Sequence, residues 1–177
     1  NFNKFDKKKL NIYNYITKNQ NTNTLDALKY AYELTKKKKF IGVLTLPLNK
    51  HKINKSVNKN IIDQTSFFSN SDNQKNSNMI FFHNGKFFTP LTIHIELKKV
   101  YELFKNTNSM VKKIENLYST LIKDFNIKQP KMILAGINPH AGEQDTISKD
   151  DNKYLMPIIK KLNKKDILID GPVSGDG

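Results

Sequence analysis

Residues 131–143, which read KMILAGINPHAGE, constrain the fold more than any other part of the chain. An unbroken apolar run over residues 132–137 stops at Asn138-Pro139, and His140 follows at once. Such a run is typical of a strand covered on both faces, and proline ends it because proline has no N–H group to donate. Ligands of open α/β sheets bind beyond the carboxyl ends of the strands, so an imidazole here is well placed for chemistry. The alternative is that His140 is an ordinary loop residue, which is the commoner role of a single histidine.

Two more short apolar segments, residues 40–46 (FIGVLTL) and 167–169, also predict buried strands. Apolar residues at helical spacing predict helices that begin at Thr24, cover residues 107–125 and follow Ser148. Pro157 should either kink the last of these helices or mark its first turn. The alternation of helices and strands indicates an α/β fold with a mainly parallel sheet flanked by helices.

A β-hairpin is predicted between the first two helices of this series. Asn84-Gly85 is a strong two-residue turn signal, and it separates apolar residues 79–82 from a second run over residues 86–95. His94 lies near the end of that second run, where it is either a histidine paired across the hairpin or a functional group. We interpret His83, beside the turn, and His51 as surface residues.

Composition narrows the range of partners. The net charge of +14 suggests nucleic-acid binding, but all 30 basic residues are lysine, and arginine supplies the bidentate contacts that nucleic-acid readers favour. The lysines are scattered along the chain, so we expect no nucleic-acid partner. Cysteine is absent, which excludes disulfides and thiolate metal sites. No apolar run approaches the roughly 20 residues of a membrane helix, and the N-terminus has no signal-peptide core. We therefore expect a cytoplasmic protein without membrane contact.

The nine residues AGINPHAGE resemble the signature of the 4-hydroxythreonine-4-phosphate dehydrogenases of vitamin B6 biosynthesis. Further segments resemble motifs of that family in the same order: Thr45–Lys50 (T-x-P-x-x-K), Gln64-Thr65, Thr92–Leu97 (T-x-H-x-x-L) and the Gly171-Pro172 turn with Asp176. Members of the family have an earlier glycine-rich segment and a long C-terminal portion. The resemblance therefore implies that residues 1–177 are a partial α/β dehydrogenase chain.

The resemblance also implies roles for four residues. His94 and His140 correspond to two metal-ligand histidines of the family, whose third ligand is a histidine further downstream. Thr65 corresponds to a substrate-binding threonine, and Gln64 stands where the family has a substrate-binding histidine. Glutamine can donate or accept a hydrogen bond but cannot carry charge, so the effect of Gln64 on substrate affinity stays open.

The implied activity is the oxidation, with decarboxylation, of 4-phosphohydroxy-L-threonine by NAD or NADP. A divalent metal (zinc, magnesium or cobalt) would assist both steps. The resemblance further implies an isocitrate/isopropylmalate dehydrogenase-like fold and a homodimer. The residues alone identify neither the general base, nor the metal, nor the preferred nicotinamide cofactor. A truncated or decayed, inactive member of the family is the alternative, and we expect the 177-residue chain by itself to be inactive because the third histidine is missing from it.

Overall fold

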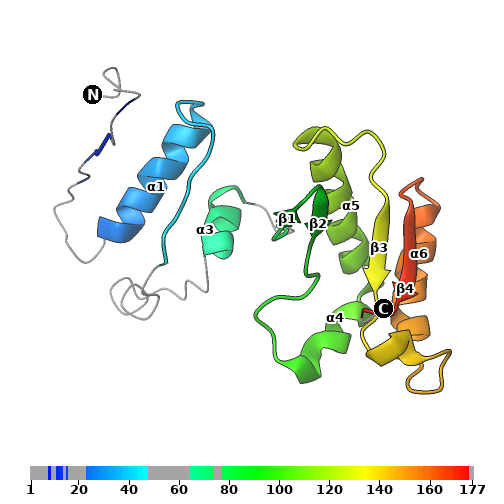
Figure 1. Cartoon of the computed structure of the whole chain (residues 1–177). Coiled ribbons are helices and arrows are strands. Elements are labelled where there is room, and N and C mark those ends of the chain that lie inside the picture. Colours follow the sequence, from blue (N-terminus) through cyan, green and yellow to red (C-terminus); the bar gives the residue numbers. More distant parts are fainter. Residues whose placement is uncertain are drawn as a thin grey trace. The chain divides into compact units, whose positions relative to one another are not determined.

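The computed structural model describes residues 8, 11–13, 15, 23–47, 64–73 and 77–175. They belong to two compact units, Asn1–Asn73 and Gln74–Gly177, which are treated separately below (Figure 1). Within these described ranges, no helix is both long enough and apolar enough to cross a membrane.

The first unit contains the helices α1 (Asn23–Lys36) and α3 (Gln64–Ser71). Its small core joins Leu25 and Leu28 of α1 to Phe67 of α3. A polar contact reinforces the same pairing, because the Tyr32 hydroxyl donates to Asp72 Oδ1 at 2.6 Å and Lys36 Nζ approaches that oxygen at 2.8 Å. These two donors lower the pKa of the Asp72 carboxyl group. The helix predicted from Thr24 is thus confirmed, whereas α3 was not predicted.

The strand predicted at residues 40–46 is wrong. This segment (cyan in Figure 1) pairs with no strand among the described residues, and Ile41 and Leu44 are almost fully exposed. Val43 of this run packs against the core of Leu25, Leu28 and Phe67. A strand needs a neighbour for its backbone donors and acceptors, and the described part of this unit provides none.

In the part that the structure describes, residues 77–175, the second unit carries two small sheets and several helices. Its elements are β1 (Phe81–His83), β2 (Lys86–Phe88), η1 (Leu97–Lys99), α4 (Val100–Lys105), α5 (Thr107–Lys123), β3 (Met132–Ala135), η2 (Pro139–Gly142), the π-helical turn η3 (Asp151–Leu155), α6 (Met156–Asn163) and β4 (Ile169–Val173).

Strands β3 and β4 are parallel, with Met132 opposite Ile169, and the helices α5 and α6 pack beside them (Figure 1). The core between strands and helices includes Ile114 of α5, Leu134 of β3 and Leu162 of α6. The predicted parallel pairing is confirmed, although β4 begins at Ile169 and extends through Gly171-Pro172.

The prediction that these strands are covered on both faces is wrong. Along β3, Leu134 is buried whereas Ile133 is 71% exposed, and Leu168, just before β4, is 54% exposed. This alternation is typical of a sheet packed on one side only. In the described residues, α5 and α6 supply apolar cover for a single face.

Helix α5 matches the prediction closely. The side chain of Asn106 caps it by accepting a hydrogen bond from Ser109 N at 3.1 Å.

Pro157 lies in the first turn of α6, directly after the π-helical turn η3, as one of the two alternatives for this proline predicted. Proline has no N–H to donate, and it lies where the π-helical bonding of η3, such as Met156 N to Asp151 O, gives way to α6.

The hairpin is confirmed, with a shorter second strand than predicted. Asn84 and Gly85 both have positive φ, 47° and 76°, as the tight turn that favours an Asn-Gly pair requires. Strand β2 ends at Phe88 instead of continuing to residue 95, because Pro90 has no N–H to pair. His94 therefore lies in a loop, not in a strand.

Candidate metal centre

The two histidines expected to bind metal lie in two loops of the second unit. His140 follows β3 in η2, at the carboxyl end of a parallel strand as predicted, and its side chain is exposed. His94 is exposed in the loop between β2 and η1. Both have left-handed backbone conformations, with φ of 51° and 52° respectively. That their ring nitrogens converge on one ion stays a prediction.

The described residues contain no group of three or more His, Cys, Asp or Glu side chains that could hold a metal ion by itself. His94 and His140 would supply two imidazole ligands, which suit zinc or cobalt but need further donors to complete a site. The two imidazoles would therefore supply part of the ligand set of a metal site.

The His140 loop (residues 136–145) is held by a buried carboxylate. Asp151, at the start of η3, is only 1% exposed. Its Oδ1 accepts from the backbone N of Ile137 at 2.7 Å, and its Oδ2 accepts from Asn138 Nδ2, also at 2.7 Å. Distances this short are typical of charge-assisted hydrogen bonds.

Sequence reasoning did not single out Asp151. An acidic residue just ahead of an apolar helix is ordinarily interpreted as a favourable partner of the helix dipole, and Asp150 and Asp151 both fit that pattern. The pattern did not indicate which of the two faces inward.

Two glycines of the loop pack directly against this carboxylate. A Cβ atom on Gly136 would stand 2.8 Å from Asp151 Oδ1 and 2.7 Å from the Cα of Ala141. A Cβ atom on Gly142 would stand 2.3 Å from the carbonyl oxygen of Ser148 and 3.3 Å from Asp151 Oδ2. The spacing of the two glycines in AGINPHAGE thus follows from the close approach of the loop to Asp151 and its neighbours.

The turn after His140 is conformationally unusual. The six residues from His140 to Asp145 all have positive φ, between 46° and 77°. Each non-glycine residue in this region costs about 1 kcal/mol or more, so the surrounding structure must impose the conformation. Backbone hydrogen bonds contribute, such as Ala141 N to Asn138 O at 3.1 Å and Ile147 N to Gly142 O at 3.0 Å.

The His94 loop (residues 89–96) is tied to α5 by a lysine. Lys113 Nζ donates to the carbonyl oxygen of Leu91 at 2.7 Å. Burial lowers the pKa of the Lys113 ammonium group below its ordinary value of 10.5, because the charged form loses water. Each histidine loop is therefore fixed to the unit by a charged side chain from a helical element.

The lowered pKa predicts a pH dependence of stability. Below its folded pKa, Lys113 carries its full desolvation cost in the folded chain, and above about pH 10.5 it is neutral in both states. The unfolding free energy of the wild type minus that of Lys113→Met should therefore rise as the pH is raised towards that value. Urea unfolding at about pH 8 and about pH 10.5 measures it. A difference that stays flat or falls would contradict the prediction.

No described contact joins the other predicted site residues to these two loops. Gln64 and Thr65 form the first turn of α3 in the first unit, where Gln64 Nε2 donates to Leu46 O at 3.4 Å. Their position relative to the histidines is not defined, because they belong to a different unit. His83 is exposed at the end of β1, as predicted. Three other residues of the sequence-based interpretation, Lys50, His51 and Asp176, lie outside the described residues.

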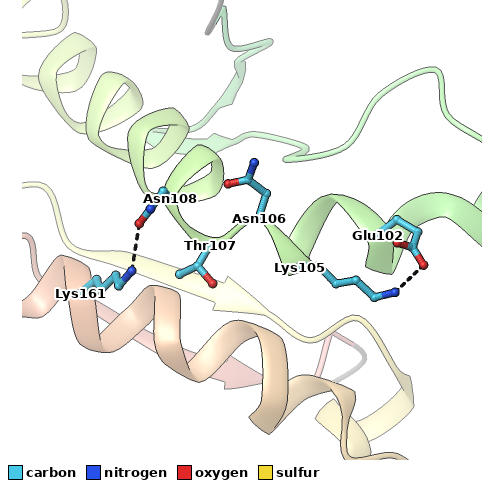
Figure 2. Close-up of a pocket in the computed structure, with 6 residues that line it drawn as sticks. All are labelled: Glu102, Lys105, Asn106, Thr107, Asn108 and Lys161. Carbon is cyan, nitrogen blue, oxygen red and sulfur yellow. Dashed lines mark hydrogen bonds and ion pairs between the residues drawn. The ribbon is translucent and has the colours of Figure 1, made fainter.

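A cavity of about 560 Å³ opens where α4 meets α5, beside α6 (Figure 2). Its lining includes two lysines, but both are paired: Lys105 Nζ with Glu102 at 2.6 Å and Lys161 Nζ with Asn108 Oδ1 at 2.9 Å. Neither histidine of the candidate metal centre lines this cavity.

Known proteins resemble the chain over most of its length. The family model described as pyridoxal phosphate biosynthetic protein PdxA matches residues 3–177. A 4-hydroxythreonine-4-phosphate dehydrogenase of Methylorubrum extorquens is 35% identical over 88 residues, which are 49% of this chain and 25% of the relative. A putative D-threonate 4-phosphate dehydrogenase of Clostridium botulinum is 26% identical over 149 residues, 84% of this chain and 44% of the relative.

Among solved structures, the 4-hydroxythreonine-4-phosphate dehydrogenase of Klebsiella pneumoniae superposes with a TM-score of 0.77 at 18% identity. The match covers 88% of this chain and 47% of that one. It supports the α/β fold with helices and small sheets. The chain spans less than half the length of each protein compared.

Proposed function

The chain belongs to the pyridoxal phosphate biosynthetic protein PdxA family. On this basis we propose that it takes part in the metal-assisted, NAD- or NADP-dependent oxidation of 4-phosphohydroxy-L-threonine. The observation that carries the proposal is the AGINPHAGE segment, which places His140 at the carboxyl end of β3 on a loop fixed by Asp151. The proposal includes an isocitrate/isopropylmalate dehydrogenase-like fold, a homodimer and a cytoplasmic location.

The residues of this chain would act mainly by binding and orienting. The imidazoles of His94 and His140 would hold a divalent ion through neutral ring nitrogens, and further donors would complete its coordination. Such an ion lowers the pKa of a substrate hydroxyl group and, after oxidation, draws electron density towards the resulting carbonyl group. Gln64 and Thr65 would contribute hydrogen bonds to the substrate, without the charge that a histidine at position 64 could carry.

Divalent-ion binding tests the assignment of the two histidines. His94→Ala and His140→Ala should each weaken Co²⁺ or Zn²⁺ binding to the full-length protein by about tenfold or more, because a ligand is lost. Neither change should alter stability much, since both side chains are exposed. Calorimetric titration measures the binding, and thermal unfolding measures the stability.

His83→Ala provides the matched control, because His83 is exposed in the same unit but belongs to no family motif. It should bind the ion as the wild type does. Equal affinities for the wild type, His94→Ala and His140→Ala would contradict the metal assignment.

The similarity to the Clostridium protein supports a second candidate substrate, D-threonate 4-phosphate. Both candidates are phosphorylated hydroxy acids, so the same metal-assisted oxidation applies to each. Full-length protein assayed with each compound, with NAD and NADP in turn, would distinguish them by kcat/KM. Absence of turnover with both compounds would favour the inactive, decayed alternative.

A further inference from the structure

We propose that Asp151 is a positioning residue that sets the divalent-ion affinity of the candidate centre by fixing the His140 loop. The inference rests on the proposed function, because it assumes that His140 is a metal ligand. Asp151 itself touches the loop backbone and Asn138, and it acts on the metal through His140.

The first support is the burial of a charged group. A carboxylate that is 1% exposed is costly unless hydrogen bonds replace its lost water. Asp151 accepts hydrogen bonds from the N–H of Ile137 and the amide of Asn138, which lie three and two residues before His140. The interactions that compensate for burying this charge are thus made with the segment that leads directly into the histidine.

The second support is the position of these bonds along β3. The last ladder-like hydrogen bond of this strand runs from Gly136 N to Val173 O at 2.8 Å. Asp151 then accepts from the next N–H, that of Ile137. Asp151 therefore supplies the acceptor for Ile137, just beyond Gly136, whose acceptor comes from β4. The chain leading to His140 is thus held past the end of the sheet.

The third support is the shape of the loop. Gly136 and Gly142 bracket His140, and a Cβ atom on either would approach a different oxygen of Asp151, at 2.8 and 3.3 Å. Both ends of the turn thus pack on one carboxylate. The left-handed conformation of His140 (φ 51°) needs restraint of this kind to persist.

The test compares Asp151→Asn with Asp150→Asn in the full-length protein. The asparagine at 151 keeps the shape of the side chain, but its NH₂ group cannot accept from Asn138. Asp150→Asn removes the same charge one residue away, where no side-chain bond to the His140 loop is described. Hydrogen exchange across residues 136–145 without metal, and Co²⁺ titration with its absorption spectrum, are measured for each protein.

We expect Asp151→Asn to speed exchange in the loop and to weaken Co²⁺ binding by about tenfold, the lower end of the effect of outer-shell partners. Asp150→Asn should change neither. Wild-type Co²⁺ affinity and spectrum in a folded Asp151→Asn protein would overturn the proposal. If that variant does not fold, Asn138→Ala, which deletes one of the two bonds, decides by the same two outcomes.

Failure of the proposed function is recognised separately. It would appear as equal Co²⁺ affinity of the wild type and His140→Ala, before any Asp151 variant is considered. In that case the proposed role of Asp151 in metal binding would be contradicted as well.

Discussion

Leu162→Ala is expected to destabilise the second unit by about 2–5 kcal/mol, the usual cost of truncating a fully buried leucine. Leu162 has no exposed surface and lies on α6 in the core that joins the helices to β3 and β4. Its removal loses both the transfer free energy of the side chain and the packing around it, because neighbouring groups relax only partly into the space. Urea unfolding followed by circular dichroism measures the change.

Leu168→Ala is the matched control for this prediction. It removes the same atoms six residues further along, from a side chain that is 54% exposed. We expect its cost to be under about 1 kcal/mol, since a half-exposed side chain gains less from burial and leaves no closed cavity. Similar losses for the two variants would show that α6 does not form the core of this unit.

The sequence predicted the elements whose pattern is local. The apolar stripe of α5, the Asn84-Gly85 turn and the stop of β3 before Pro139 each depend on residues close together in the chain, and each is present. The position of His140 just past a parallel strand followed from the same local signal.

Features that depend on distant partners were predicted less well. Residues 40–46 have the composition of a buried strand, but composition does not reveal whether a neighbouring strand is present. Asp151 was missed for a related reason. Whether an acidic residue before a helix faces water or a loop depends on the path of that loop, which the sequence does not encode locally.

Gly142→Ala is expected to be the other strongly destabilising substitution, because it causes both backbone strain and a steric clash. Gly85→Ala is the control, because it causes the backbone strain alone. Both glycines have nearly the same φ, 77° and 76°, so alanine at either position costs about 1–2 kcal/mol in backbone strain. A Cβ atom at Gly85 would meet nothing within 4 Å, whereas at Gly142 it would stand 2.3 Å from the carbonyl oxygen of Ser148. Because that neighbour is backbone, the loop itself must move.

We therefore expect Gly142→Ala to cost about 1–3 kcal/mol more than Gly85→Ala, the range typical of forcing extra atoms into a packed site. Urea unfolding of the two variants at one pH measures the difference. The displaced loop should also weaken Co²⁺ binding in Gly142→Ala alone, because Gly85 lies in the hairpin and Gly142 lies two residues after His140. Equal stability of the two variants would mean that the contact with Ser148 is easily relieved. The glycine of the AGINPHAGE segment would then be required for its backbone conformation only, and not for the close packing that holds His140 in place.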